Sequence, residues 1–235
     1  MNDLQAKDVL GAAAQTLINA RCRGAYMHDM RGALQAIYSS LELLARSAKL
    51  AAQNPALIDG AASIAKRAMA NYEQFMVSLV NQVTGSDGSP VILNLWTLVQ
   101  QAQQFLRNDA LGREIALTLS GRDDLLVLSE PNKLRSLILG LLALSIDASP
   151  TGAELHVELS CAEGFAVLEL RSHLTFEAVR GAEDLFCREP VNLKPQELVM
   201  GFARQLIAAN GGRVEIPSAT GAQAGLRLYH PLAAA

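Results

Sequence analysis

His28 is the residue of this sequence best suited to group-transfer chemistry. It is followed by Asp29, and three arginines lie within about two helical turns of it, namely Arg21, Arg23 and Arg31. An imidazole is largely neutral near pH 7, so a ring nitrogen can attack phosphorus, while arginines attract phosphate oxygens. The cluster suits a histidine that carries a phosphoryl group. Taken alone, a surface His beside Asp is most often only a solvated pair, and the arginines are as typical of a solvated helix face as of a phosphate site.

The residues around His28 have the spacing of a long amphipathic helix. Two apolar series, each stepping by seven residues, form an a/d seam: Met27, Leu34 and Leu41 with Met30, Ile37 and Leu44. His28 falls one residue beyond the seam. We therefore expect its ring to face water.

A second helix is predicted to pair with the first. Asn54 and Pro55 are suited to the cap and first turn of a helix, and an apolar stripe follows from Ile58 to Val83. Residues 3–83 thus predict a helical hairpin. Two such helices leave part of each seam uncovered, so we expect a homodimer that forms a four-helix bundle.

The chain changes character after a short linker. The stretch from Thr84 to Pro90 is rich in Gly, Ser and Asp. We assign residues 1–84 to the helical hairpin, 85–90 to the linker and 91–235 to an α/β sandwich. The last part predicts an α+β fold. Its expected helices are 94–110, 131–148 and 196–209, and its expected strands are 114–119, 125–128, 155–160, 165–171, 213–216 and 226–229.

Composition and charge exclude several functional classes. Half of the 235 residues are hydrophobic and 18% are charged, so the chain is expected to fold. The net charge of -3 lacks the basic excess of a nucleic-acid binder. The longest mostly apolar run, Leu134 to Ile146, is shorter than the ~20 residues that span a bilayer. We expect no nucleic-acid or membrane partner.

The cysteines and the N-terminus favour a cytoplasmic protein. Cys22, Cys161 and Cys187 are odd in number and show no Cys-x-x-Cys or Cys/His spacing, which argues against disulfides and zinc. The polar start MNDLQAKD is not typical of a signal peptide. The other histidines, His156, His173 and His230, have no ligand partners at metal spacing, and core or surface roles are expected for them.

Three segments resemble parts of bacterial histidine kinases. AYMHDMRGALQAIYSSLELL (25–44) is similar to the box that carries the phosphoacceptor histidine. EPNKLRSLILGLLALSIDAS (130–149) resembles the N-box helix of the GHKL-type ATP-binding domain. GFARQLIAANGGRVEI (201–216) resembles the helix and strand after its last glycine box. The resemblance implies a kinase-derived architecture over nearly the whole chain.

The departures from that pattern imply that nucleotide binding is lost. Gly140 and Leu144 match the two N-box asparagines that hold magnesium and phosphates, and neither offers an oxygen ligand. The adenine-reading Asp and its glycines are replaced within residues 172–176, Ser-His-Leu-Thr-Phe. The final glycine box corresponds to residues 195–199, where Glu197 would repel phosphate. We expect no ATP, cofactor or metal bound by the chain itself.

What remains resembles the dimeric histidine phosphotransferases of bacterial phosphorelays. The resemblance implies that His28 carries a phosphoryl group between aspartates of response regulator receiver domains, which supply the magnesium. Asp29 would orient the ring, and Arg31 or Arg23 would screen the transferred charge. A hybrid histidine kinase is a further candidate partner. Gly32 stands where bifunctional kinases carry Thr or Asn, which disfavours phosphatase activity.

Two other functions stay open at this point. A pseudokinase adaptor would bind a response regulator or a kinase without transferring phosphate. A kinase with an unorthodox nucleotide site would bind ATP and phosphorylate itself. The retained His28–Asp29 pair favours transfer over the adaptor, because an adaptor does not need it.

Overall fold

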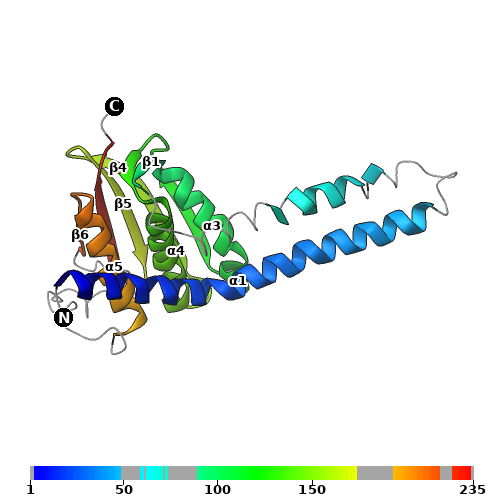
Figure 1. Cartoon of the computed structure of the whole chain (residues 1–235), viewed down its shortest axis with the longest axis horizontal. Coiled ribbons are helices and arrows are strands. Elements are labelled where there is room, and N and C mark those ends of the chain that lie inside the picture. The colour runs from blue at the N-terminus through cyan, green and yellow to red at the C-terminus, as the bar shows by residue number, and fades with distance from the viewer. Residues whose placement is uncertain are drawn as a thin grey trace. The chain divides into compact units, whose positions relative to one another are not determined.

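The chain forms two compact units in the computed structural model. The model describes residues 3–48, 59–60, 62–70, 72–73, 89–173, 193–217 and 224–233. The larger unit combines residues 1–22 with 87–235, and the smaller unit holds residues 23–86. The long helix α1 (Asp3–Ala48) contributes to both. Figure 1 labels α1 and most of the other elements. The first 22 residues thus group with the C-terminal part of the chain, whereas the sequence placed them with the hairpin.

A five-stranded mixed sheet forms one layer of the larger unit. Its strands are β2 (Ala116–Gly121), β4 (Glu154–Ala162), β5 (Phe165–Ser172), β6 (Arg213–Glu215) and β7 (Ala224–Pro231). They lie in the order β2-β4-β5-β7-β6, with β2 parallel to β4 and the other pairs antiparallel. Glu163 and Gly164 join β4 to β5, both at positive φ, which suits the twist of a tight hairpin.

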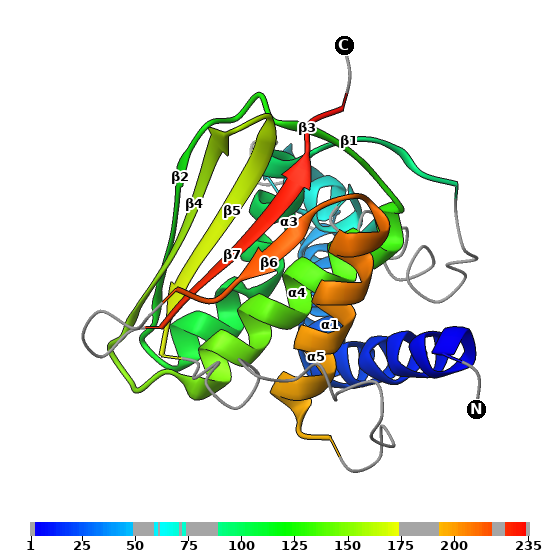
Figure 2. The same cartoon turned by 90° about the vertical axis from the view of Figure 1, so that its left-hand side faces the viewer.

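Three helices cover one face of this sheet. They are α3 (Leu95–Gly112), α4 (Pro131–Ala148) and α5 (Pro195–Ala209), and Figure 2 shows them as a layer beside the strands. The core lies between the layers. One small apolar space inside it is lined by side chains of α3, α4, β4 and β5: Val99, Ile138, Leu141, Leu142, Val157, Leu168 and Leu170. The predicted α+β fold of this part is confirmed.

The predicted elements of the larger unit agree with the structure, with one addition. Helix α4 begins at Pro131 as expected, because proline fits the first turn of a helix. The strand β1 (Val91–Asn94) was not predicted; it pairs antiparallel with β3 (Leu126–Ser129) in a separate two-stranded sheet. Asn94 then caps α3, because its Oδ1 accepts a 2.9 Å hydrogen bond from the Thr97 N–H.

The first part of α1 adds a third layer to the larger unit. Leu10, Ala14, Ile18 and Cys22 recur every four residues and are all buried. They share one face of the helix, and Figure 2 shows this part of α1 on the side of α4 and α5 away from the sheet. The helical layer is therefore covered on both sides.

The smaller unit is helical wherever the structure describes it. α1 continues to Ala48, and residues 59–60, 62–70 and 72–73 are helical. Ser40 and Ala68 are buried there. The predicted cap at Asn54 and Pro55 lies outside the described residues, and so does most of the linker. The hairpin stays a prediction. Within the described ranges, no helix has the length and apolar character needed to cross a membrane.

Candidate functional site

The four predicted site residues lie on α1 within the smaller unit. His28 and Asp29 are part of the helix, although their side chains are outside the described atoms. Arg23 and Arg31 are exposed. Residues three apart on a helix are neighbours, whereas residues five apart are not. Position 31 therefore adjoins position 28, and Arg23 lies further round the helix.

The heptad seam beside position 28 forms an open apolar groove. Met27, Leu34 and Leu41 are 45%, 46% and 56% exposed. The groove has a volume of about 580 Å³ and is lined by Met27, Met30, Arg31, Leu34, Gln35, Ile37, Tyr38 and Leu41. Exposed apolar side chains gathered along one helix face are typical of an interaction surface.

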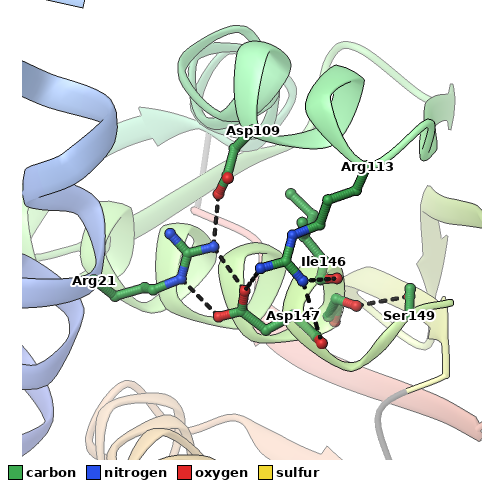
Figure 3. A network of polar contacts seen from close by, with 7 residues as sticks. Arg21, Asp109, Arg113, Ile146, Asp147 and Ser149 are labelled. Carbon is green, nitrogen blue, oxygen red and sulfur yellow. Dashed lines mark hydrogen bonds and ion pairs between the residues drawn. The ribbon is translucent and has the colours of Figure 1, made fainter. Parts of the chain in front are cut away.

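Arg21 does not belong to the arginine cluster expected around His28. Its Nε lies 2.6 Å from Asp147 Oδ2 in α4, and its second guanidinium nitrogen lies 2.6 Å from Asp109 Oδ2 in α3. Arg113 also reaches Asp147, at 2.9 Å, as Figure 3 shows. The hydrogen bond to Asp147 contributes most to raising the pKa of Arg21. Arg21 therefore fastens α1 to α3 and α4.

Two glycines let α1 approach α4 and α5 closely. A Cβ at Gly140 in α4 would lie 2.7 Å from Ile18 Cδ1, and one at Gly201 in α5 would lie 2.7 Å from a methyl of Leu10. Gln15 donates a short hydrogen bond to the hydroxyl of Ser136. We call the surface around Gly140, Gly201 and Ser136 the α4–α5 face. Residues 10–22, which cover it, are the docked segment.

Burial of the docked segment stabilises the larger unit. Leu10 and Ile18 are almost fully buried, and burying one aliphatic side chain contributes about 1.5 to 3 kcal/mol. Cys22 ends the buried stripe, and burial raises the pKa of its thiol to about 11. The segment is thus held by apolar packing at its core and by ion pairs at its end.

Comparisons with known proteins agree with this architecture. The chain is similar to the catalytic domain of histidine kinase ThkA, with 14% identity and a TM-score of 0.53 over 62% of this chain and 97% of that one. The chain is also similar to the mycobacterial sensor histidine kinase MprB, with 17% identity and a TM-score of 0.50 over 61% of this chain and 97% of that one. The C-terminal part has the fold of a histidine kinase catalytic domain. A histidine kinase from Burkholderia phymatum STM815 has 15% identity and a TM-score of 0.50, over 92% of this chain and 98% of that one. No family model and no curated protein matches the chain.

At Gly140, which the sequence resemblance sets against an N-box asparagine, a larger side chain could not enter unless Ile18 moved. Gly140 is buried, and Ile18 occupies the space that a side chain at this position would need. Leu144, matched to the second asparagine, is half-buried and apolar. Hard cations such as magnesium require oxygen ligands. Neither position fits a metal.

Glu197, in the segment that the sequence resemblance sets against the last glycine box, caps the start of α5. Glu197 is buried, and its Oε2 accepts a 2.6 Å hydrogen bond from the Lys194 N–H at the start of α5. A carboxylate there also interacts favourably with the helix dipole. In the box expected to read adenine, Ser172 is buried and His173 is half-buried. Residues 174–176 lie outside the described residues.

The remaining histidines have structural surroundings. His156 lies between two hydroxyls of β2, 2.8 Å from Thr118 Oγ1 and 3.1 Å from Ser120 Oγ. His230 is buried, and its Nδ1 donates to the carbonyl of Pro231 at 3.1 Å. In the part of the chain that the structure describes, no three His, Cys, Asp or Glu side chains gather as a metal site.

The docked segment and its carboxylate partners were missed in the sequence. Its residues were assigned to the hairpin because they continue the same helix. Two signals were present: the four-residue recurrence of Leu10, Ala14, Ile18 and Cys22, and glycines inside α4 and α5. A glycine within a helix often marks a close contact with another element.

Proposed function

We propose that this protein is a histidine phosphotransferase of a two-component phosphorelay, with His28 as the phosphoryl carrier and no ATP bound. The fold is that of a histidine kinase catalytic domain, joined to a helix that bears the His28–Asp29 pair. The observation that carries the proposal is the contact of Ile18 with Gly140. It supports a domain that kept its shape while the place of its metal ligand was taken by an isoleucine.

The phosphoryl group is transferred in two displacement steps. One ring nitrogen of neutral His28 attacks the phosphorus of a receiver's aspartyl phosphate, and the bond to the carboxylate oxygen breaks with its electron pair returning to the aspartate. The aspartate of a second receiver then attacks the phosphorus, and the nitrogen–phosphorus pair returns to the ring. Magnesium bound by the receiver offsets the charge of the phosphoryl oxygens.

The neighbours of His28 have supporting roles in this proposal. Asp29 orients the ring, or polarises its N–H by accepting a hydrogen bond from it. Arg31, which adjoins position 28 on the helix, pairs with phosphoryl oxygens during the in-line displacement. Arg23 contributes a more distant positive charge.

A second copy of the chain is the partner that we propose for the open seam. The apolar residues that line the groove from Met27 to Leu41 recur with a seven-residue period. Such a heptad pattern is typical of a helix that packs against a second helix in a coiled coil. Two hairpins related by a two-fold axis would bury both seams. The bundle so formed would present one His28 from each copy to a receiver.

Transfer of labelled phosphate tests the function. Purified receiver domains, phosphorylated with radiolabelled acetyl phosphate, are mixed with the full chain, and label on the chain is followed on gels. His28→Ala should abolish labelling and leave the circular dichroism spectrum unchanged. Arg31→Ala should slow transfer by about tenfold, the effect of one charge-assisted hydrogen bond, and Arg23→Ala should slow it less.

Three outcomes would overturn the proposal. If His28→Ala leaves labelling unchanged, another group accepts the phosphate. If no receiver labels the chain but several bind it, the protein is a pseudokinase adaptor. Calorimetry with Mg-ATP is expected to show no saturable heat, and saturable heat with autophosphorylation would instead identify a kinase.

A further inference from the structure

The α4–α5 face is shaped to accept one face of a helix. Gly140 and Gly201 are both buried, and each leaves a hollow that is filled by one aliphatic side chain of α1. Ile18 enters the hollow at Gly140, which Val199 of α5 also borders, and Leu10 enters the hollow at Gly201. The two inserted side chains are eight residues apart, which places them on one face of the docked segment.

Charged groups at one end of the face fix the register of the helix. Asp147 and Asp109 both bind Arg21, which lies three residues after Ile18. A guanidinium group binds carboxylates through N–H groups of fixed direction as well as through charge. The two aspartates therefore fix where the arginine lies along the face. The face therefore reads two aliphatic side chains followed by an arginine.

The contact has features of a surface that opens. The middle of the docked segment is held by one small buried side chain, Ala14, and by the hydrogen bond from Gln15 to Ser136. Gln205 Oε1 in α5 is buried beside Gly11 without a hydrogen-bond partner among the described residues. The Arg21 and Asp147 side chains keep 27% and 32% of their surface exposed to solvent. The buried, unpaired amide oxygen of Gln205 lowers the stability of the contact, because it has lost its hydrogen bonds to water. Water also competes with the partly exposed ion pairs.

We propose that the α4–α5 face is a receptor site for an amphipathic helix, that the docked segment is its resident ligand, and that the segment leaves and returns while the sheet stays folded. The ligand class is a helix with aliphatic side chains eight residues apart and an arginine three residues after the second. The site is independent of His28 and of phosphate transfer.

A peptide tests the receptor site directly. In the full chain carrying Ile18→Asp, the docked segment loses the side chain that fills the hollow at Gly140. A fluorescein-labelled synthetic peptide of residues 3–24 should then bind this chain saturably, at least tenfold more tightly than a peptide that itself carries Ile18→Asp. It should bind the unaltered chain at least tenfold more weakly than the variant, because there the site is occupied. Equal binding of the two peptides to the variant would overturn the proposal.

Hydrogen exchange followed by mass spectrometry tests whether the contact opens locally. Gly140→Leu fills the hollow, so exchange in peptides covering residues 10–22 should accelerate at least tenfold, while peptides from β4 and β5 keep their protection. Gly112→Leu is the matched control, because no atom lies within 4 Å of a Cβ at Gly112. Arg21→Glu should reproduce the acceleration through the charged end.

Two results of the exchange measurement would overturn the proposal. If β4 and β5 lose protection together with residues 10–22 in Gly140→Leu and in Arg21→Glu, the segment is a permanent part of the core. If neither variant accelerates exchange in residues 10–22, the face does not hold the segment.

Discussion

The guanidinium Nε of Arg21 lies 2.6 Å from Oδ2 of Asp147, and the same guanidinium group reaches Asp109. One side chain of α1 therefore binds carboxylates from two helices of the kinase-like fold. Arg21→Ala should lower the free energy of unfolding by about 1 kcal/mol, a value at the upper end for a partly exposed ion pair because two carboxylates lose a partner. Urea denaturation followed by circular dichroism measures the change.

Arg122 provides the matched control for Arg21. It pairs with Asp124 at 2.6 Å, but both side chains are more than half exposed. Arg122→Ala should therefore leave the urea midpoint almost unchanged. Equal losses in the two variants would contradict the role of Arg21 in fastening α1.

The cysteines should differ in reactivity. Burial raises the pKa of Cys22 to about 11, so at pH 8 only about one thiol in a thousand is ionised. Cys161 is exposed. Iodoacetamide at pH 8, followed by peptide mass spectrometry, should modify Cys22 at least tenfold more slowly than Cys161. Comparable rates in the folded chain would show that Cys22 is not covered as described.

Stability should fall as the solution becomes acidic, in part through His230. Burial lowers the pKa of this histidine from its usual 6.5, and the hydrogen bond to Pro231 opposes that shift only in part. Below about pH 6.5 the unfolded chain binds a proton at His230 that the folded chain does not yet bind. The contribution of neutral His230 to the free energy of unfolding is therefore complete above that pH and is lost as the pH falls through the folded pKa. Urea midpoints at pH 7.5 and 5.5 should differ less in His230→Leu. If the difference between the two urea midpoints is the same in His230→Leu as in the unaltered chain, the loss of stability in acid comes from other groups.

The open seam predicts dissociation when a charge is placed in it. Leu34→Asp should convert a dimer into a monomer, because a carboxylate would be buried between paired helices without a partner. Light scattering after size-exclusion chromatography measures the mass. Ser39→Asp, at an exposed position outside the groove, is the control. A chain that is already monomeric before substitution would refute the proposed bundle.

The sequence predicted the C-terminal elements well because each carries a local signal. Pro131 begins α4, the turn at Glu163 and Gly164 separates two alternating strands, and Asn210 with Gly211 ends α5. Such signals depend on backbone preferences of a few neighbouring residues. The strand β1 lacks them: it has four residues, and only its pairing with β3 makes it a strand.

The docked segment could not be assigned from helix periodicity. Ile18 lies in a helix that is correctly predicted, but nothing local says which surface covers it. Its partner Gly140 lies more than a hundred residues later in the chain, and their contact depends on the assembled helical layer. The position of Arg21 near His28 along the chain was misleading for the same reason, since its ion-pair partners come from α3 and α4.

The fit of Ile18 against Gly140 also limits the routes by which this domain could change. An asparagine at position 140 would meet Ile18 at its first side-chain atom, at less than van der Waals distance. Any larger residue at position 140 would have to displace the Ile18 side chain or move α1 away from α4. A smaller side chain at position 18 would relieve that crowding, so positions 18 and 140 are expected to tolerate substitution as a pair rather than singly.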